Sequence, residues 1–213
     1  MNKNLTELVF IIDKSGSMSG LEADTIGGFN SLIEKEKSDN DDVIVSTVLF
    51  NNKMDVIHDR VNIQKVNKMT TNDYYASGST ALLDAIGFTI SHILETRRKF
   101  KDEYVPSKTM VVITTDGYEN SSSEYSYANI KKLIEKQKEL GWEFIFLGAN
   151  IDVAKEAGKF GIDKDMAVKF NNDSEGVAIN YKALACAIKD VKETGKVNKK
   201  WRKSIDEDYN KRG

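Results

Sequence analysis

Four apolar stretches rich in β-branched residues recur along the chain, and they constrain its fold more than any other feature. They are "ELVFIID" (7–13), "DVIVSTVLFN" (42–51), "SKTMVVITTDG" (107–117) and "WEFIFLGAN" (142–150). A strand that is apolar on both faces lies inside a parallel sheet, and helices must then cover both sides of that sheet. Because stretches with helical periodicity alternate with these strands, the pattern predicts an α/β fold.

The remaining segments indicate how this sheet is arranged. Apolar residues at helical spacing predict helices over 21–37, 80–100, 124–140 and 175–194, with a short helix and a short strand (166–170) before the last of them. The stretch "MDVIHDRV" (54–61) instead alternates apolar and polar residues after a turn, which is typical of a hairpin with a half-exposed edge strand. We therefore expect a doubly wound, Rossmann-like, mostly parallel sheet of about six strands, with one antiparallel edge strand and helices on both faces.

The composition excludes several classes of protein. One cysteine and two histidines rule out a disulfide framework and leave little scope for a zinc cluster built on these residues. The net charge of -2 argues against a nucleic-acid-binding surface. The apolar runs are far shorter than the roughly 20 residues that cross a bilayer, and no signal-peptide pattern opens the chain. We expect a cytoplasmic protein that contacts neither membrane nor nucleic acid.

Polar side chains follow the predicted strands at one edge of the sheet. Asp13, Ser15 and Ser17 leave the first strand, Thr80 begins the long helix, and Asp116 ends a later strand. Ligands of doubly wound sheets bind outside the carboxyl ends of the strands, so we expect these five oxygen donors to converge. Oxygen ligands without histidine or cysteine select Mg²⁺, Ca²⁺ or Mn²⁺, and small hydroxyls with few carboxylates favour Mg²⁺.

A simpler interpretation exists for the segment that follows the first strand. Serine and aspartate are favoured at helix N-caps and turns for hydrogen-bonding reasons alone. Taken by themselves, Asp13, Ser15 and Ser17 fit a cap as well as they fit a metal site. Thr80 and Asp116 at the same predicted edge favour the metal site.

The spacing of an EF-hand calcium loop is absent at both places where such a loop could begin. Counted from Asp13, Met18 and Asp24 occupy the positions that require glycine and glutamate. Counted from Asn171, the stretch "NNDSEG" supplies the glycine, but Lys182 stands where the glutamate is needed.

These motifs together resemble a known family. "DKSGS" (13–17) looks like the DxSxS motif of the von Willebrand factor A domain family, Thr80 in "GST" like its threonine, and Asp116 in "TTDG" like its later aspartate. In that family these residues form the metal-ion-dependent adhesion site, and the match covers about 1–175. The resemblance implies that Ser15, Ser17 and Thr80 hold the metal directly or through water, and that Asp13 and Asp116 do so partly through water. It also implies an open coordination position, which an aspartate or glutamate of a partner protein fills.

The resemblance therefore implies a protein-binding module and not an enzyme. Mg²⁺ is the expected ion, with Mn²⁺ and Ca²⁺ as alternatives. The stretches "SGSTAL" and "TDGYEN" are similar to those of stand-alone bacterial or phage members found near tellurium-resistance or AAA-ATPase systems, which implies a partner in such a stress-response system. The alternative is a Mg²⁺- or Mn²⁺-dependent phosphoesterase, for which Lys14, Tyr118 and Glu119 are the nearby candidates, although Lys14 should point away from Asp13.

The end of the chain allows two interpretations. Residues 1–195 are expected to form the von Willebrand A-type domain, and 196–213 a charged extension with Trp201 and Tyr209 as its large apolar groups. The extension is either partly ordered and solvated, or a docking segment in which Trp201 packs on this domain or on a partner.

A few single residues carry smaller expectations. Cys186 lies on the apolar stripe of the last predicted helix and is expected in the core. His58 is expected at the surface or its boundary. Asp84, one turn after the threonine, is either a hydrogen-bond acceptor behind the metal site or a surface residue. Tyr74 and Tyr75 are expected either at the rim of the crevice or in the packing of the domain.

Overall fold

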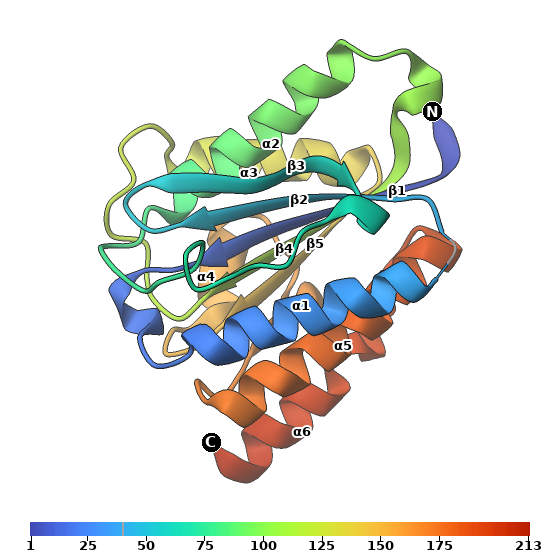
Figure 1. Ribbon diagram of the computed structural model, residues 1–213. Helices are drawn as coiled ribbons and strands as arrows, with labels where there is room; N and C mark the ends of the chain where they lie inside the picture. The colour runs from blue at the N-terminus through green and yellow to red at the C-terminus, as the bar shows by residue number, and fades with distance from the viewer. Residues whose placement is uncertain (40) are drawn as a thin grey trace.

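A single six-stranded sheet forms the centre of the computed structural model, which describes residues 1–39 and 41–213 (Figure 1). Its strands are β1 (Asn2–Asp13), β2 (Val43–Phe50), β3 (Met54–Asn62), β4 (Pro106–Thr115), β5 (Trp142–Gly148) and β6 (Ala167–Lys169). The spatial order is β3-β2-β1-β4-β5-β6. Every neighbouring pair is parallel except β2 and β3, which pair antiparallel. The predicted doubly wound sheet with one antiparallel edge strand is confirmed.

Helices cover both faces of this sheet. They are α1 (Glu22–Ser38), α2 (Leu82–Arg98), α3 (Tyr127–Glu139), α4 (Val153–Lys159), α5 (Ser174–Thr194) and α6 (Lys203–Arg212). Helices α1, α5 and α6 lie on one face, and α2, α3 and α4 on the other (Figure 1). Within the described ranges, 1–39 and 41–213, none of the helices has the length and apolar character needed to cross a membrane.

The central strand β1 shows why both faces are covered. Leu8, Phe10 and Ile12 belong to the buried cluster that includes α1 and α5. Val9 and Ile11 belong to the cluster on the opposite face, which includes α2 and α3. Since successive side chains of a strand point to opposite faces, the uninterrupted apolar run can bury all five residues only when both faces are covered.

The loop between β6 and α5 folds back tightly over the first turn of α5. Asp173 is the N-cap residue, and its Oδ1 accepts a 2.8 Å hydrogen bond from the N–H of Gly176. A Cβ on Gly176 would lie only 2.0 Å from the carbonyl oxygen of Asn171. Glycine at this position therefore allows the loop to approach the helix as closely as it does.

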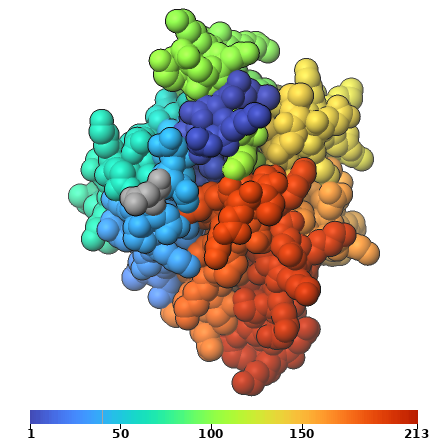
Figure 2. Space-filling view, turned by 90° about the vertical axis from the view of Figure 1, so that its right-hand side faces the viewer, coloured from blue at the N-terminus to red at the C-terminus, as the bar shows by residue number. Residues whose placement is uncertain are grey.

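The C-terminal segment packs on the rest of the chain. Trp201 is buried, and its Nε1 donates a 3.1 Å hydrogen bond to the carbonyl oxygen of Asp165. Ile205 on α6 is also buried within the cluster that contains α1 and α5. Figure 2 shows the last residues, coloured red, forming one continuous surface with the preceding helix. Of the two interpretations of this segment, the structure therefore shows the one in which Trp201 docks on this chain.

Two predictions about single residues are wrong. Cys186 is exposed, because the buried stripe of α5 passes through Ala185 and Ala187 on either side of it. His58 is buried against β2, where its Nδ1 lies 3.1 Å from Thr47 Oγ1. The edge strand therefore turns this polar ring inward, which alternation of apolar and polar residues could not indicate.

Candidate metal centre

The centre lies where the order of the strands reverses. Strands β1 and β4 are neighbours, but the chain leaves β1 towards β2 on one side and leaves β4 towards β5 on the other. Loops that diverge in this way leave a crevice beyond the carboxyl ends of the two strands. Asp13 is the last residue of β1 and Asp116 follows the last residue of β4, so both carboxylates lie at this edge.

Asp13 joins the two central strands at the base of the crevice. Its side chain is fully buried. Its Oδ1 accepts a 2.6 Å hydrogen bond from the N–H of Ser15, and its Oδ2 accepts one of 2.6 Å from the hydroxyl of Thr115. The hydroxyl of Tyr74 donates to the carbonyl oxygen of Asp13 over 2.7 Å. Asp13 therefore fixes the backbone that presents the two serines.

The three predicted hydroxyl groups lie around one point, and Asp116 borders it. Ser15 Oγ and Ser17 Oγ are 3.1 Å apart, and the hydroxyl of Ser17 donates to Asp116 Oδ1. A Cβ on Gly117 would lie 3.4 Å from Ser17 Oγ and 3.7 Å from Thr80 Oγ1, so both oxygens face the same small space. Together with Asp13, which holds Ser15, the structure thus brings all five predicted residues together at this edge of the sheet.

The loop that carries Thr80 is hydrogen-bonded to the loop after β1 and to the loop after β4. The N–H of Gly16 donates to the carbonyl oxygen of Gly78 over 3.0 Å. Thr80 N–H donates to Asn120 Oδ1 over 2.8 Å, and the N–H of Asn120 donates back to the carbonyl oxygen of Thr80 over 3.0 Å. Gly78 has a φ of 76°, which suits glycine at this turn. The hydroxyl of Thr80 is therefore held in place by backbone contacts on two sides.

The spacing of the serine oxygens can be compared with that of metal ligands. Mg²⁺ binds oxygens at about 2.0–2.1 Å in octahedral geometry, so adjacent ligands lie about 3.0 Å apart. The 3.1 Å between Ser15 Oγ and Ser17 Oγ fits that separation. Calcium has longer bonds of about 2.3–2.6 Å but takes six to eight ligands, so the same separation also suits Ca²⁺. Among the described parts of the chain, no three His, Cys, Asp or Glu residues gather as a metal cluster.

Electrostatics at the crevice favour a cation. Burial raises the pKa of Asp13 to about 6, the nearby charge of Asp116 acts in the same direction, and the hydrogen bonds from Thr115 and Ser15 only partly offset the burial. At neutral pH the crevice therefore carries negative charge that is poorly compensated by water. A divalent ion would supply the missing positive charge.

The charged neighbours of the crevice have partners of their own. The Lys14 side chain is buried and its Nζ lies 2.5 Å from Asp55 Oδ2 on β3. Glu119 accepts hydrogen bonds from the N–H groups of Leu83, Ser121 and Ser122, at 2.7–2.9 Å. These two side chains hold the loops together.

Asp84 also binds backbone N–H groups, and so stabilises the loop that follows β4. Its carboxylate accepts hydrogen bonds of 2.9–3.0 Å from the N–H groups of Ser123, Glu124 and Tyr125. It is buried, so it is not a surface residue.

Three further residues at the crevice carry no signal that the sequence motifs indicate. Thr115 and Asn120 contact Asp13 and Thr80, as described above. Asn172, from the loop after β6, donates from Nδ2 to Asp116 Oδ2 over 3.2 Å. Since β6 ends at the same edge of the sheet, the rule that placed Asp13 and Asp116 would also have pointed to this polar loop.

Comparison with known proteins identifies the family. The model of the von Willebrand factor type A domain matches residues 7–182. The chain belongs to this family. No curated protein sequence matches it.

Solved structures with the same fold are distant in sequence. Proximal thread matrix protein 1 from the mussel byssus, "with zinc occupied MIDAS motif", superposes with a TM-score of 0.62 at 12% identity, over 87% of this chain and 48% of that one. A von Willebrand factor type A protein from Catenulispora acidiphila gives 0.60 at 17% identity, over 87% and 42%. Manganese-loaded TRAP protein of Plasmodium vivax gives 0.57 at 16% identity, over 84% and 73%. The chain thus spans less than half the length of the first two.

Proposed function

We propose that the chain binds one Mg²⁺ ion through Asp13, Ser15, Ser17, Thr80 and Asp116, and through that ion captures a carboxylate of a protein partner. The observation that carries the proposal is the pair of serine oxygens 3.1 Å apart, joined by Ser17 to the carboxylate of Asp116. The zinc-occupied motif named for one structure of this fold and the manganese-loaded protein named for another support a divalent ion.

The charge of the donor set supports capture of an acidic group. Three of the five side chains are neutral hydroxyls, and only Asp13 and Asp116 carry charge. Of these two, Asp13 accepts hydrogen bonds from Ser15 and Thr115 with its two carboxylate oxygens, so it affects the ion mainly through its charge and not as a direct ligand. An ion held mostly by hydroxyls keeps more of its charge for an external carboxylate than one surrounded by carboxylates. An aspartate or glutamate of the partner is the ligand that such an ion favours.

The enzymatic alternative has less support. A phosphoesterase needs a base or nucleophile beside the metal and a cation to hold phosphate. The nearest candidates, Lys14 and Glu119, are engaged with Asp55 and with backbone N–H groups. Tyr118 accepts a 3.1 Å hydrogen bond from the N–H of Asp152. We therefore propose a binding module without catalytic activity.

The setting in which the module acts is also a proposal. The similarity of "SGSTAL" and "TDGYEN" to stand-alone family members supports a bacterial or phage protein that works inside the cell. We propose that its partner belongs to a stress-response system of the tellurium-resistance or AAA-ATPase kind. We also propose that residues 1–195 form the binding domain and that 196–213 is an extension docked on it.

The function is tested by selection for ligands. A random peptide library displayed on phage is panned on the chain in Mg²⁺ and counter-selected on Asp116→Ala. We expect enriched peptides that contain aspartate or glutamate and that lose binding in chelator or when that residue becomes asparagine or glutamine. Peptides that bind equally well in chelator would contradict the proposal. Hydrolysis of a generic phosphoester in Mg²⁺ or Mn²⁺, lost in Asp13→Ala, would instead support the enzyme.

The raised pKa of Asp13 predicts how metal binding depends on pH. A carboxyl group whose pKa rises from 3.8 to about 6 on folding stabilises the metal-free fold when protonated, and this contribution is lost as the pH rises through about 6. A metal ion must displace that proton. We expect the affinity for Mg²⁺ to be constant above pH 7 and to fall about tenfold per pH unit below about 5.5. Calorimetry between pH 5 and 8 measures it, and an affinity independent of pH over that range would contradict the prediction.

A further inference from the structure

Asn172 has a buried oxygen without a partner at the edge of the metal centre. Its Nδ2 donates to Asp116 Oδ2 over 3.2 Å, which brings the amide group against the carboxylate. Its Oδ1 is buried and accepts no hydrogen bond from any residue that the structure describes. Buried amide oxygens are nearly always hydrogen-bonded, so this one calls for an explanation.

The chemistry of the two groups limits what that explanation can be. An amide oxygen only accepts hydrogen bonds, and so does the ionised carboxylate of Asp116 beside it. A neighbour that suits both must therefore be a hydrogen-bond donor or a cation, and a metal ion with its bound waters supplies both. Asparagine oxygens and waters are ordinary ligands of hard divalent ions.

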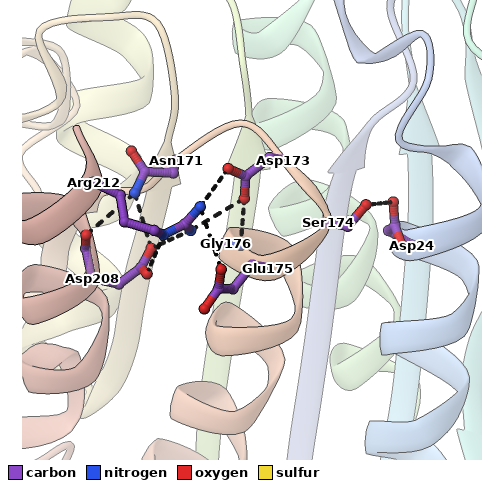
Figure 3. Close-up of polar contacts among 8 residues, drawn as sticks. All are labelled: Asp24, Asn171, Asp173, Ser174, Glu175, Gly176, Asp208 and Arg212. Atoms are coloured by element: carbon purple, nitrogen blue, oxygen red, sulfur yellow. Dashed lines mark hydrogen bonds and ion pairs between the residues drawn. The ribbon is translucent and has the colours of Figure 1, made fainter.

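Helix α6 forms hydrogen bonds and an ion pair with the residues on either side of Asn172 (Figure 3). Asn171 Nδ2 donates to Asp208 Oδ2 over 2.9 Å. Arg212 Nη1 donates to Asp173 Oδ2 over 2.7 Å, and the same guanidinium bonds to Asp208. The residues on both sides of Asn172 are thus tied to the C-terminal helix, while the side chain of Asn172 itself turns to Asp116.

Helix α1 contacts the first residue of α5, directly after this loop. Ser174 Oγ donates to Asp24 Oδ2 over 2.7 Å (Figure 3). Asp24 belongs to α1, which follows the loop of the two serines. With contacts to α1 and α6, the loop has a fixed position, and the side chain of Asn172 is pre-organised at the crevice.

We propose that Asn172 is a sixth residue of the metal site. Its Oδ1 faces the ion directly or through one bound water, and its Nδ2 orients Asp116. This inference rests on the proposed function, because it requires the metal that the five other residues hold. It deepens that function, since it makes the loop between β6 and α5, and the helix that anchors it, part of the site.

Calorimetric titration of the full chain with Mg²⁺ tests the inference. Asn172→Ala is compared with Asn171→Ala, a matched change in the same loop at a side chain that contacts α6 instead of the site. We expect the Mg²⁺ affinity to fall about tenfold in Asn172→Ala and to change less than about threefold in Asn171→Ala. Equal losses in the two variants would overturn the inference, because loop order alone would then explain them. Thermal unfolding in chelator verifies that both variants fold.

A second variant tests whether Asn172 faces the metal ion or has only a structural role. Asn172→Asp keeps the shape but presents carboxylate oxygens to the ion, and Ca²⁺ accepts more carboxylates than Mg²⁺ does. We expect the ratio of Ca²⁺ to Mg²⁺ affinity to rise about tenfold, and to stay unchanged in Asn171→Asp. An unchanged ratio in Asn172→Asp would overturn the inference. If the unmodified chain binds no divalent ion, the proposed function itself fails; if it binds Mg²⁺ and Asn172→Ala binds equally well, only this inference fails.

Discussion

Replacing Asp116 by alanine should lower the affinity for Mg²⁺ at least about a hundredfold and leave the fold intact. Removing a residue that only supports a metal ligand lowers the metal affinity about 10–100-fold, and removing a carboxylate at the ion should lower it more. Asp116 also receives the hydroxyl of Ser17 and the amide of Asn172, so its loss frees two groups that border the ion. Its charge is one of the causes that raise the pKa of Asp13. Relief of this repulsion offsets part of the cost of the two lost hydrogen bonds, so the metal-free variant should still fold, with a lowered unfolding temperature.

The matched control for this change is Asp102→Ala, which removes an exposed aspartate from a turn outside the crevice. Calorimetry with Mg²⁺ measures both variants, and thermal unfolding in chelator measures their stability. We expect the control to bind as the unmodified chain does. Wild-type affinity in Asp116→Ala would mean that any ion binds elsewhere.

Replacing Glu7 by alanine should have the largest effect on stability. Its carboxylate has no exposed surface and pairs with Arg60 of β3 and Arg97 of α2, while the guanidinium of Arg97 lies 4.6 Å from the centre of the Trp142 ring. Both arginines are nearly buried, with side chains 9% and 11% exposed. Removing one partner of a buried ion pair leaves uncompensated charge and costs about 3–5 kcal/mol of the free energy of unfolding. Urea denaturation followed by circular dichroism measures this loss.

Glu95→Ala is the comparison for Glu7. Glu95 of α2 pairs with Lys99, the residue directly after that helix, and both side chains are about two-thirds exposed. Exposed pairs of this kind contribute less than about 0.5 kcal/mol. Since Glu7 lies in the first half of β1 and Asp13 ends that strand, the Mg²⁺ affinity should not change in either variant. A loss below about 1 kcal/mol in Glu7→Ala would contradict the expected role of this network.

The fold and most of the candidate site could be predicted from local sequence patterns. The strands carry apolar runs long enough to show burial on both faces, and β3 shows the alternation of an edge strand. The position of Asp13 and Asp116 then follows from a rule about parallel sheets: both lie after strands that end at one edge. The extent of β1 was underestimated, since its polar first residues, from Asn2, extend along β4 and carry no apolar signal.

Contacts between distant segments could not be predicted in this way. Glu7 meets Arg97 only because α2 crosses the sheet above β1, and no local pattern gives the rotation of that helix. Trp201 reaches Asp165 for a comparable reason. The side chain of Asn172 turns to Asp116 because α6 holds its neighbours, and the charged sequence of α6 alone does not indicate where it docks. Cys186 lies next to the buried stripe of α5, where a shift of one residue decides exposure.

Anomalous diffraction from crystals of the chain grown in Mn²⁺ tests the central claim most directly, because it locates the ion. We predict a single anomalous peak in the crevice beyond β1 and β4, bounded by the hydroxyls of Ser15, Ser17 and Thr80 and by Asp116, and absent from crystals of Asp116→Ala. Oxygens at about 2.0–2.3 Å from the peak would fit a hard divalent ion. No peak at saturating Mn²⁺, or a peak away from these residues, would contradict the account.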